Sequence, residues 1–245
     1  MIWVVIGASS AIAREFARQA AAQGAGILLA GRDAADLEAG AADIAVRASV
    51  PCRVALFDIA DSSEHENLLD AARDFAAGGE INVFLAAGTM PAQSDIDLDP
   101  GLAASTIVTN YTGAVLLLQR FAPIFEAQKS GAIVALGSVA GDRGRLKNYV
   151  YGSAKAGLHA YLQGLRARLV RAGAHVATVK PGFVDTAMTW GLPGLFLVAS
   201  PKSVAQACLR AVAKKRDIVY APFFWWGIMT IIKHIPERVF KKLNI

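Results

Sequence analysis

A serine, a tyrosine and a lysine between positions 138 and 155 have the residue types and spacing for acid–base chemistry. Tyr151 and Lys155 are four residues apart, so a helix beginning near Tyr151 would place the phenol and the ammonium on one face. A phenol with an ordinary pKa of about 10 transfers protons poorly at neutral pH, and a nearby cation lowers that pKa. Ser138 lies thirteen residues before the tyrosine. The spacing predicts a proton-transferring tyrosine; the alternative is an amphipathic helix with a half-buried tyrosine and a surface lysine.

The elements that must position these residues alternate between apolar runs and helical patterns. Apolar runs expected to form strands lie at 2–6, 26–30, 53–57, 81–86, 132–136, 176–179 and 218–220. Helical patterns lie at 14–24, from 33 to about 49, at 62–77, within 100–128, and at 151–172 and 200–214. Strands that are apolar on both faces are typical of a parallel sheet covered on both sides. Because parallel crossovers are right-handed, the sequence predicts a Rossmann-type, doubly wound α/β fold of about seven strands.

The composition indicates one domain over residues 1–245, with a tail at 221–245. Hydrophobic residues make up 54% and charged residues 18% of the chain, which excludes a disordered protein. The net charge of +5 suits an anionic ligand or an anionic membrane surface and is too diffuse to indicate nucleic-acid binding. Cys52 and Cys208 lie far apart, so we expect neither a metal site nor a disulfide, as in a reducing cytoplasmic compartment. No uninterrupted apolar run reaches the roughly 18 residues of a spanning helix.

The turn after the first strand has the small residues that a dinucleotide pyrophosphate requires. Gly7 permits a tight turn, and Ser9 and Ser10 offer hydroxyls near the free N–H groups of the following helix. Ala11 and Ala13 stand where a second and third glycine are expected. The turn therefore predicts cofactor binding, with a purely structural strand-helix turn as the alternative.

Arg32 and Asp33 follow the second strand. A guanidinium suits the 2′-phosphate of NADP, whereas an acidic residue suits the ribose hydroxyls of NAD. The order of the two residues favours NADPH over NADH; the alternative is a solvated Arg32 with Asp33 on the ribose. Asp58 and Ile59, after the third strand, would reach the adenine, and Asp58 could instead cap a helix.

The joint order of these motifs resembles the short-chain dehydrogenase/reductase family over essentially the whole chain. The resemblance rests on Gly7, Asp58, Gly88, Asn110, Ser138, Tyr151, Lys155 and Pro181-Gly182. It implies that Ser138 hydrogen-bonds the substrate carbonyl and that Tyr151 transfers the proton. It also implies that Lys155 binds the nicotinamide ribose and lowers the phenol pKa, while Asn110 completes a water-linked proton relay. The implied cofactor-binding residues are Gly7, Ser9, Ser10, Ile12, Arg32, Asp58, Ile59, Ala87, Gly88, Tyr151, Lys155, Pro181, Gly182, Val184 and Thr186.

The chain departs from the family at one motif, and a second position has an alternative role. Leu85-Ala86-Ala87-Gly88 replaces the family's Asn-Asn-Ala-Gly and so lacks a polar anchor for the central sheet. Thr186 resembles the family's threonine that holds the nicotinamide carboxamide, and helix N-capping is its alternative role.

Three further segments point to the substrate. Arg143, Arg145 and Lys147 form a basic loop that suits a substrate phosphate, or else a solvated loop. The segment 188–198, with Met188 and Trp190, lies where this family places its substrate lid; it suits a greasy ligand, a membrane or an oligomer interface. The tail at 221–245 joins aromatic and basic residues, which suits a membrane interface or a second subunit.

The tail and the Asn148-Tyr-Val-Tyr-Gly-Ser-Ala-Lys run also resemble, within this family, the reductases that complete the epimerisation of polyprenyl-phosphoryl ribose to the arabinose donor. This resemblance implies NADPH-dependent reduction of a lipid-linked 2-keto-pentose beside a flavin-dependent oxidase. We expect a cytoplasmic homodimer or homotetramer with peripheral contact to the inner face of the membrane, and no metal. The alternatives are a reductase of a soluble ketone or sugar and a non-catalytic dinucleotide-binding regulatory protein.

Overall fold

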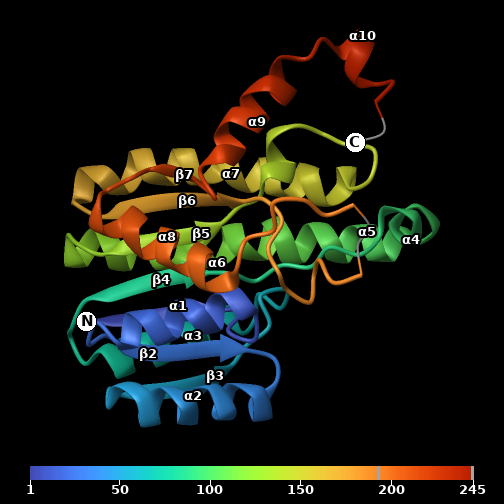
Figure 1. Ribbon diagram of the computed structural model, residues 1–245. Coiled ribbons are helices and arrows are strands. Elements are labelled where there is room, and N and C mark those ends of the chain that lie inside the picture. The colour runs from blue at the N-terminus through green and yellow to red at the C-terminus, as the bar shows by residue number, and fades with distance from the viewer. Residues whose placement is uncertain (192–193, 244–245) are drawn as a thin grey trace.

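A seven-stranded parallel sheet forms the centre of the molecule (Figure 1). The computed structural model describes residues 1–191 and 194–243. The strands follow the order β3-β2-β1-β4-β5-β6-β7, and every neighbouring pair is parallel. Their bounds are β1 Ile2–Ile6, β2 Gly26–Gly31, β3 Cys52–Leu56, β4 Ile81–Leu85, β5 Ala132–Leu136, β6 His175–Pro181 and β7 Ile218–Ala221. This arrangement confirms the predicted doubly wound fold, with the strand order reversing between β1 and β4.

Helices cover both faces of the sheet (Figure 1). One apolar core lies beneath α1, α2 and α8, and the other lies beneath α3, α6 and α7. The bounds are α1 Ala11–Ala21, α2 Ala34–Ala48, α3 His65–Ala76, α4 Gln93–Leu98, α5 Pro100–Ile107, α6 Gly113–Gln128, α7 Tyr149–Leu169, α8 Pro201–Ala213, α9 Phe224–His234 and α10 Glu237–Phe240. A π-helical turn, η1, spans Val108–Thr112, and short 3₁₀ turns, η2 and η3, span Val139–Asp142 and Val170–Ala172.

Strand β1 shows how the sequence produces a sheet covered on both sides. All of its residues are buried. Successive side chains of a strand point to opposite faces. Val4 and Ile6 therefore enter the core beneath α3, α6 and α7, while Trp3 and Val5 enter the other core. An apolar run without polar interruption is what such a position requires.

Several element boundaries differ from the predicted ones for local reasons. Helix α1 begins at Ala11, because the Ser10 hydroxyl caps it by accepting a hydrogen bond from the Ala13 N–H (3.2 Å). Strand β3 begins one residue early and is only half-buried, since it forms the edge of the sheet. The expected helix within 100–128 is divided by η1, and the sequence pattern missed α4.

The segment Pro100–Gln128 is, within residues 1–191 and 194–243, the helical stretch long and apolar enough to cross a membrane by length and composition. The stretch meets this criterion through its mean hydropathy and not through a continuous apolar run, so the search for such runs did not detect it. In this fold α6 buries Leu117, Leu118 and Phe121 against the sheet, so one face of the segment packs in the core.

The tail helices α9 and α10 project from one end of the sheet (Figure 1). Trp225 and Met229 of α9 are buried against Val139 and Tyr220 in a third, smaller apolar cluster. The tail is therefore anchored on its own chain through one face of α9.

A substitution at Gly113, the first residue of α6, tests the packing that holds η1 in place. A Cβ at Gly113 would lie 2.1 Å from the Ile59 carbonyl oxygen, whereas a Cβ at Gly164 in α7 would meet nothing within 4 Å. We expect Gly113→Ala to lower the free energy of unfolding by about 1–3 kcal/mol through overpacking. Gly164→Ala, the matched control, should raise it by about 0.5–1 kcal/mol. Urea denaturation measures both, and equal effects would contradict this packing.

Candidate active site

A cavity of about 760 Å³ opens at the carboxyl edge of the sheet, where β1, β4, β5 and β6 end. In open α/β sheets a ligand binds at this edge, beside the point where the strand order reverses. Most of the residues predicted to bind cofactor or substrate line this one cavity. They are Gly7, Ser9, Ser10, Ile12, Arg32, Asp58, Ile59, Ala87, Gly88, Ser138, Tyr151, Lys155, Pro181, Gly182, Val184, Thr186 and Met188.

The turn after β1 is shaped for close approach of an anion. Gly7 has a φ of +76°, and a Cβ there would lie 2.6 Å from the Ala87 nitrogen, so only glycine fits. The turn leads into the N-terminus of α1, whose first turn carries no acidic side chain. Free N–H groups at a helix N-terminus favour a phosphate. The Ser10 hydroxyl already accepts the hydrogen bond that caps α1, whereas Ser9 is exposed.

The end of β2 presents a basic residue to the cavity. The Arg32 side chain is 78% exposed, with its guanidinium 3.8 Å from the Asp58 carboxylate. Asp33 does not line the cavity; it caps α2 by accepting a hydrogen bond from the Asp36 N–H (3.1 Å). Asp58 closes a turn by accepting from the Ala60 N–H (2.9 Å) and does not cap α3. The sequence reasoning missed Arg14, which also lines the cavity and could have been noticed as a cation in the first turn of α1.

Tyr151 and Lys155 lie in the first two turns of α7, with the lysine Nζ 5.8 Å from the centre of the phenol ring. Burial raises the pKa of Tyr151 to about 12, and a hydrogen bond with Ser138 opposes that rise. The expectation that the lysine lowers the phenol pKa is therefore wrong for the chain by itself. Burial also lowers the pKa of Lys155 to about 8, and its ammonium donates to the Leu136 carbonyl (3.1 Å).

Ser138 follows β5 directly and is held by its own turn. Its Oγ accepts a hydrogen bond from the Ala140 N–H (3.1 Å). The hydroxyl proton remains available to donate, and the Tyr151 phenol is near enough for this serine to lower its pKa. Serine and tyrosine thus converge on one point of the cavity.

Asn110 is buried in η1 and does not line the cavity. Its amide donates to the carbonyls of Thr89 (2.7 Å) and Thr106 (2.8 Å), and its Oδ1 accepts from the Thr89 N–H (3.3 Å). A Cβ at Gly88 would lie 2.8 Å from that Oδ1 and 3.5 Å from the Lys155 Nζ. The Asn110 side chain therefore fixes the turn after β4, so the implied relay role cannot rest on a free side-chain amide.

Thr186 lies on the loop after β6 and lines the cavity. Its Oγ1 donates to the Val184 carbonyl (3.4 Å), and it begins a turn rather than a helix. The alternative of helix N-capping does not apply.

Arg143, Arg145 and Lys147, the predicted phosphate-binding cluster, do not gather at the cavity, because the two arginines contact the tail. The Arg143 guanidinium donates to the carbonyls of Lys233 and Ile235 (both 2.8 Å) at the end of α9 and lies 4.1 Å from the Phe240 ring centre. Carbonyls at a helix C-terminus are unsatisfied and attract such a cation.

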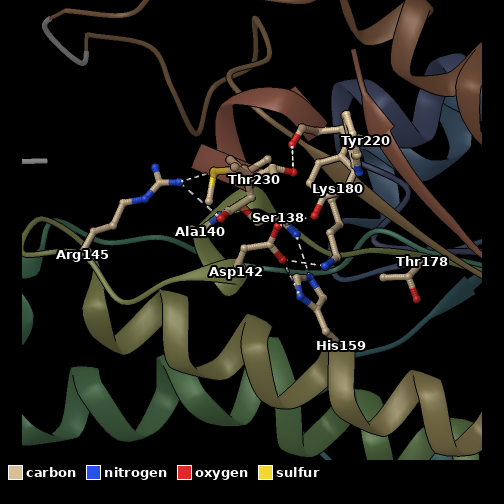
Figure 2. A network of polar contacts seen from close by, with 12 residues as sticks. Ser138, Ala140, Asp142, Arg145, His159, Thr178, Lys180, Tyr220 and Thr230 are labelled. Carbon is tan, nitrogen blue, oxygen red and sulfur yellow. Dashed lines mark hydrogen bonds and ion pairs between the residues drawn. The ribbon is translucent and has the colours of Figure 1, made fainter. Parts of the chain in front are cut away.

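Arg145 is half-buried against α9, where its guanidinium lies 3.0 Å from the Met229 sulfur (Figure 2). Lys147 is exposed, and none of the three basic residues lines the cavity. Trp190 is 88% exposed and also lies away from the cavity, whereas Met188 lines it. The prediction of a basic cluster beside the substrate is therefore wrong for Arg143 and Arg145.

A parallel sheet that reverses its strand order beside a small-residue turn, with a serine, a tyrosine and a lysine at the same edge, defines a dinucleotide-binding oxidoreductase. Residues 1–193 match the short chain dehydrogenase family. An uncharacterized oxidoreductase of Mycobacterium tuberculosis is 33% identical over 241 residues, which cover 98% of this chain and 96% of the relative. The chain belongs to the short-chain dehydrogenase family and is an NAD(P)-dependent oxidoreductase.

Solved structures share the fold. A short-chain dehydrogenase from Sphingobium yanoikuyae in complex with NADPH matches with a TM-score of 0.82 at 23% identity, covering 96% of each chain. A variant of actinorhodin polyketide ketoreductase with NADPH matches with a TM-score of 0.81 at 20% identity, covering 91% of this chain and 96% of the other.

The lowered pKa of Lys155 predicts a specific dependence of stability on pH. Its pKa falls from 10.5 to about 8 on folding, so from about pH 8 to about pH 10 the unfolded chain keeps a proton that the folded chain has released. Stability then rises with pH in that window, relative to a variant without the amine, by roughly 1 kcal/mol per pH unit. Below about pH 8 both states are protonated and the difference is constant.

The measurement is urea unfolding of the wild type and of Lys155→Met at several pH values. The exposed Lys147→Met is the matched control and should follow the wild type. Parallel curves for wild type and Lys155→Met across the window would show that burial does not depress the lysine pKa.

Proposed function

We propose that this chain reduces a ketone to a secondary alcohol with NADPH. The observation that carries the proposal is the convergence of Ser138, Tyr151 and Lys155 in the cavity at the carboxyl edge. The raised pKa of Tyr151 keeps the phenol protonated at neutral pH, which is the state required of a proton donor.

In the proposed reaction the substrate carbonyl oxygen accepts a hydrogen bond from the Ser138 hydroxyl and a proton from Tyr151. NADPH, when bound, supplies the hydride for the carbonyl carbon. Lys155 is protonated below its pKa of about 8, so at neutral pH it can bind the ribose hydroxyls and place a positive charge near the phenolate that forms. A positive charge that stabilises a developing phenolate favours proton transfer.

The residues at the turn after β1 and the end of β2 fit NADPH. The absence of a Cβ at Gly7 leaves space for a phosphate to approach the backbone, and Arg14 and Arg32 line the same cavity. Asp33 is occupied as a helix cap, which leaves Arg32 as the group for the 2′-phosphate. The NADPH in two structural neighbours agrees with this choice.

Arg32→Ala tests the cofactor preference. Losing a charge-assisted contact to phosphate should weaken NADPH binding by about 10- to 100-fold and leave NADH binding nearly unchanged. Fluorescence titration with each cofactor measures the two dissociation constants. Arg171→Ala, a change of an exposed arginine in η3 after α7, is the control and should alter neither. An equal loss for both cofactors would show that Arg32 does not contact the 2′-phosphate.

For the substrate we propose a 2-keto-pentose linked to a polyprenyl phosphate, in the epimerisation that yields an arabinose donor. Support comes from the apolar surface shared by the lid and the tail. The lid's Phe196 lies 5.6 Å from Trp225 of α9, measured between ring centres, so these two segments adjoin. The two segments also carry exposed apolar side chains: Trp190 (88%), Phe223 (74%), Trp226 (53%) and Ile231 (70%).

Such a surface suits a polyprenyl chain and the membrane that holds it. The tail adds the exposed cations Lys233, Arg238, Lys241 and Lys242, which favour an anionic leaflet. We therefore propose a cytoplasmic protein, forming a homodimer or homotetramer, with peripheral contact at the inner face of the membrane. In this epimerisation the ketone arises by oxidation of a secondary alcohol, and the partner that we propose for that step, from the resemblance alone, is a flavin-dependent oxidase.

A reductase of a soluble ketone is the second candidate. It is favoured by the positions of Arg143 and Arg145, which bind the tail and leave the cavity without the expected phosphate cluster.

The assay that separates the two candidates follows NADPH oxidation with polyprenyl-phosphoryl 2-keto-pentose and with the lipid-free keto-pentose phosphate. We expect turnover of the lipid-linked ketone to exceed that of the lipid-free one at least tenfold in kcat/KM, since burial of an apolar chain contributes about 0.8 kcal/mol per CH₂ group. Tyr151→Phe should abolish turnover while NADPH binds normally. Equal rates for both ketones would favour the soluble substrate, and turnover retained by Tyr151→Phe would remove the tyrosine as proton donor.

A further inference from the structure

A buried polar network lies directly behind Ser138 (Figure 2). Its centre is Asp142, in the short turn η2 that follows the serine, with a side chain only 3% exposed. The carboxylate accepts hydrogen bonds from the Lys180 Nζ on β6 (2.5 Å) and from the Tyr220 hydroxyl on β7 (2.6 Å). A buried carboxylate is tolerated when it is paired and hydrogen-bonded in this way. Asp142 thus ties the turn after β5 to the two neighbouring strands.

His159 joins this network to the serine. It lies on α7, two turns after Tyr151, and its Nε2 accepts a hydrogen bond from the Ser138 backbone N–H (3.3 Å). A neutral imidazole that accepts at Nε2 carries its proton on Nδ1. That nitrogen lies 3.6 Å from the Asp142 Oδ1, so the carboxylate favours this tautomer by its charge (Figure 2).

Burial and the neighbouring positive charges keep the His159 ring neutral. Burial is the main cause that lowers the pKa of His159 to about 3, and the positive charges of Lys180 and Lys155 add to it, while Asp142 opposes them. A neutral ring retains the lone pair that the Ser138 N–H requires.

The backbone around the serine is shaped to hold the imidazole. A Cβ at Gly137 would lie 2.3 Å from the His159 Nε2, and one at Gly141 would lie 2.7 Å from its Cε1. Glycines on either side of Ser138-Val-Ala therefore create a slot that the ring fills. The contact between His159 and the serine backbone is built into the turn.

We propose that His159 and Asp142 are positioning residues that hold Ser138 in place for carbonyl reduction, an inference that rests on the function proposed above. His159 fixes the serine's backbone N–H, and the Ala140 N–H fixes its Oγ. The hydroxyl proton is then free to be donated to the substrate oxygen. Asp142 holds the imidazole tautomer and anchors η2 through Lys180 and Tyr220.

The test compares His159→Leu with His159→Gln, using whichever ketone the wild type reduces fastest in the assay above. Leucine has no acceptor for the serine N–H, so kcat should fall about 10- to 100-fold through misplacement of the hydroxyl. KM and the dissociation constant of NADPH should change by less than about twofold, because His159 touches neither ligand. Glutamine can accept from the serine N–H and donate toward Asp142, so it should recover most of the rate.

A double-mutant cycle with Ser138→Ala distinguishes positioning from general damage. If His159 acts through Ser138, adding His159→Leu to Ser138→Ala should reduce kcat no further. A full additional loss, or wild-type kcat in His159→Leu, would overturn the inference. Full turnover by Ser138→Ala would instead overturn the proposed role of the serine, so the two failures are distinguishable.

A spectroscopic measurement on the wild type does not depend on whether His159→Leu folds. Nitrogen and carbon NMR of labelled histidine should show His159 as the neutral Nδ1–H tautomer from about pH 5 to about pH 8. The signal is assigned by its absence in His159→Gln, and Asp142→Asn should reduce the tautomer preference. A protonated ring or an Nε2–H tautomer in the wild type would contradict the proposed geometry.

Discussion

Close approach of the backbone at the carboxyl edge of the sheet is the constraint on which the site depends. The turn after β1 and the turn after β4 touch at Gly7 and Ala87, with no space for a Cβ between them. After β4, the absence of a Cβ at Gly88 leaves space beside the Asn110 Oδ1 and the Lys155 Nζ. Parallel strands end side by side, so their turns converge on a small area. Small residues there decide which polar side chains can reach the same cavity.

The tail is part of this convergence. Gly182, after β6, packs against the indole of Trp225, whose ring nitrogen would lie 1.9 Å from a Cβ at that glycine. Arg143, on the loop after the serine, binds the end of α9. One helix near the C-terminus therefore supports both the loop that carries the serine and the loop that carries the lid. The same helix exposes aromatic side chains on its other face. Helix α9 therefore both supports the active-site loops and presents an apolar surface.

Burial, more than pairing, sets the charges in the site. Tyr151 has its pKa raised and Lys155 has its pKa lowered, in both cases mainly by loss of water. The same cause keeps His159 neutral. Asp142 differs, because Lys180 and Tyr220 both donate to its carboxylate. The site therefore contains a protonated Tyr151, a neutral His159 and one carboxylate, Asp142, that is paired inside the protein. None of these three groups presents an unpaired negative charge, so they do not oppose the binding of an anionic cofactor in the cavity.

The sequence by itself determined the doubly wound sheet, the small-residue turn after β1 and the placement of Tyr151 and Lys155 on one helical face. These features depend on apolar periodicity and short spacings, which local backbone geometry converts directly into structure. Only the tertiary structure decided that Arg143 and Arg145 bind the tail, that the phenol pKa rises, and that Asp142 meets Lys180 and Tyr220. Such outcomes depend on burial and on contacts between residues distant along the chain, and neither has a signature in the spacing of a single segment.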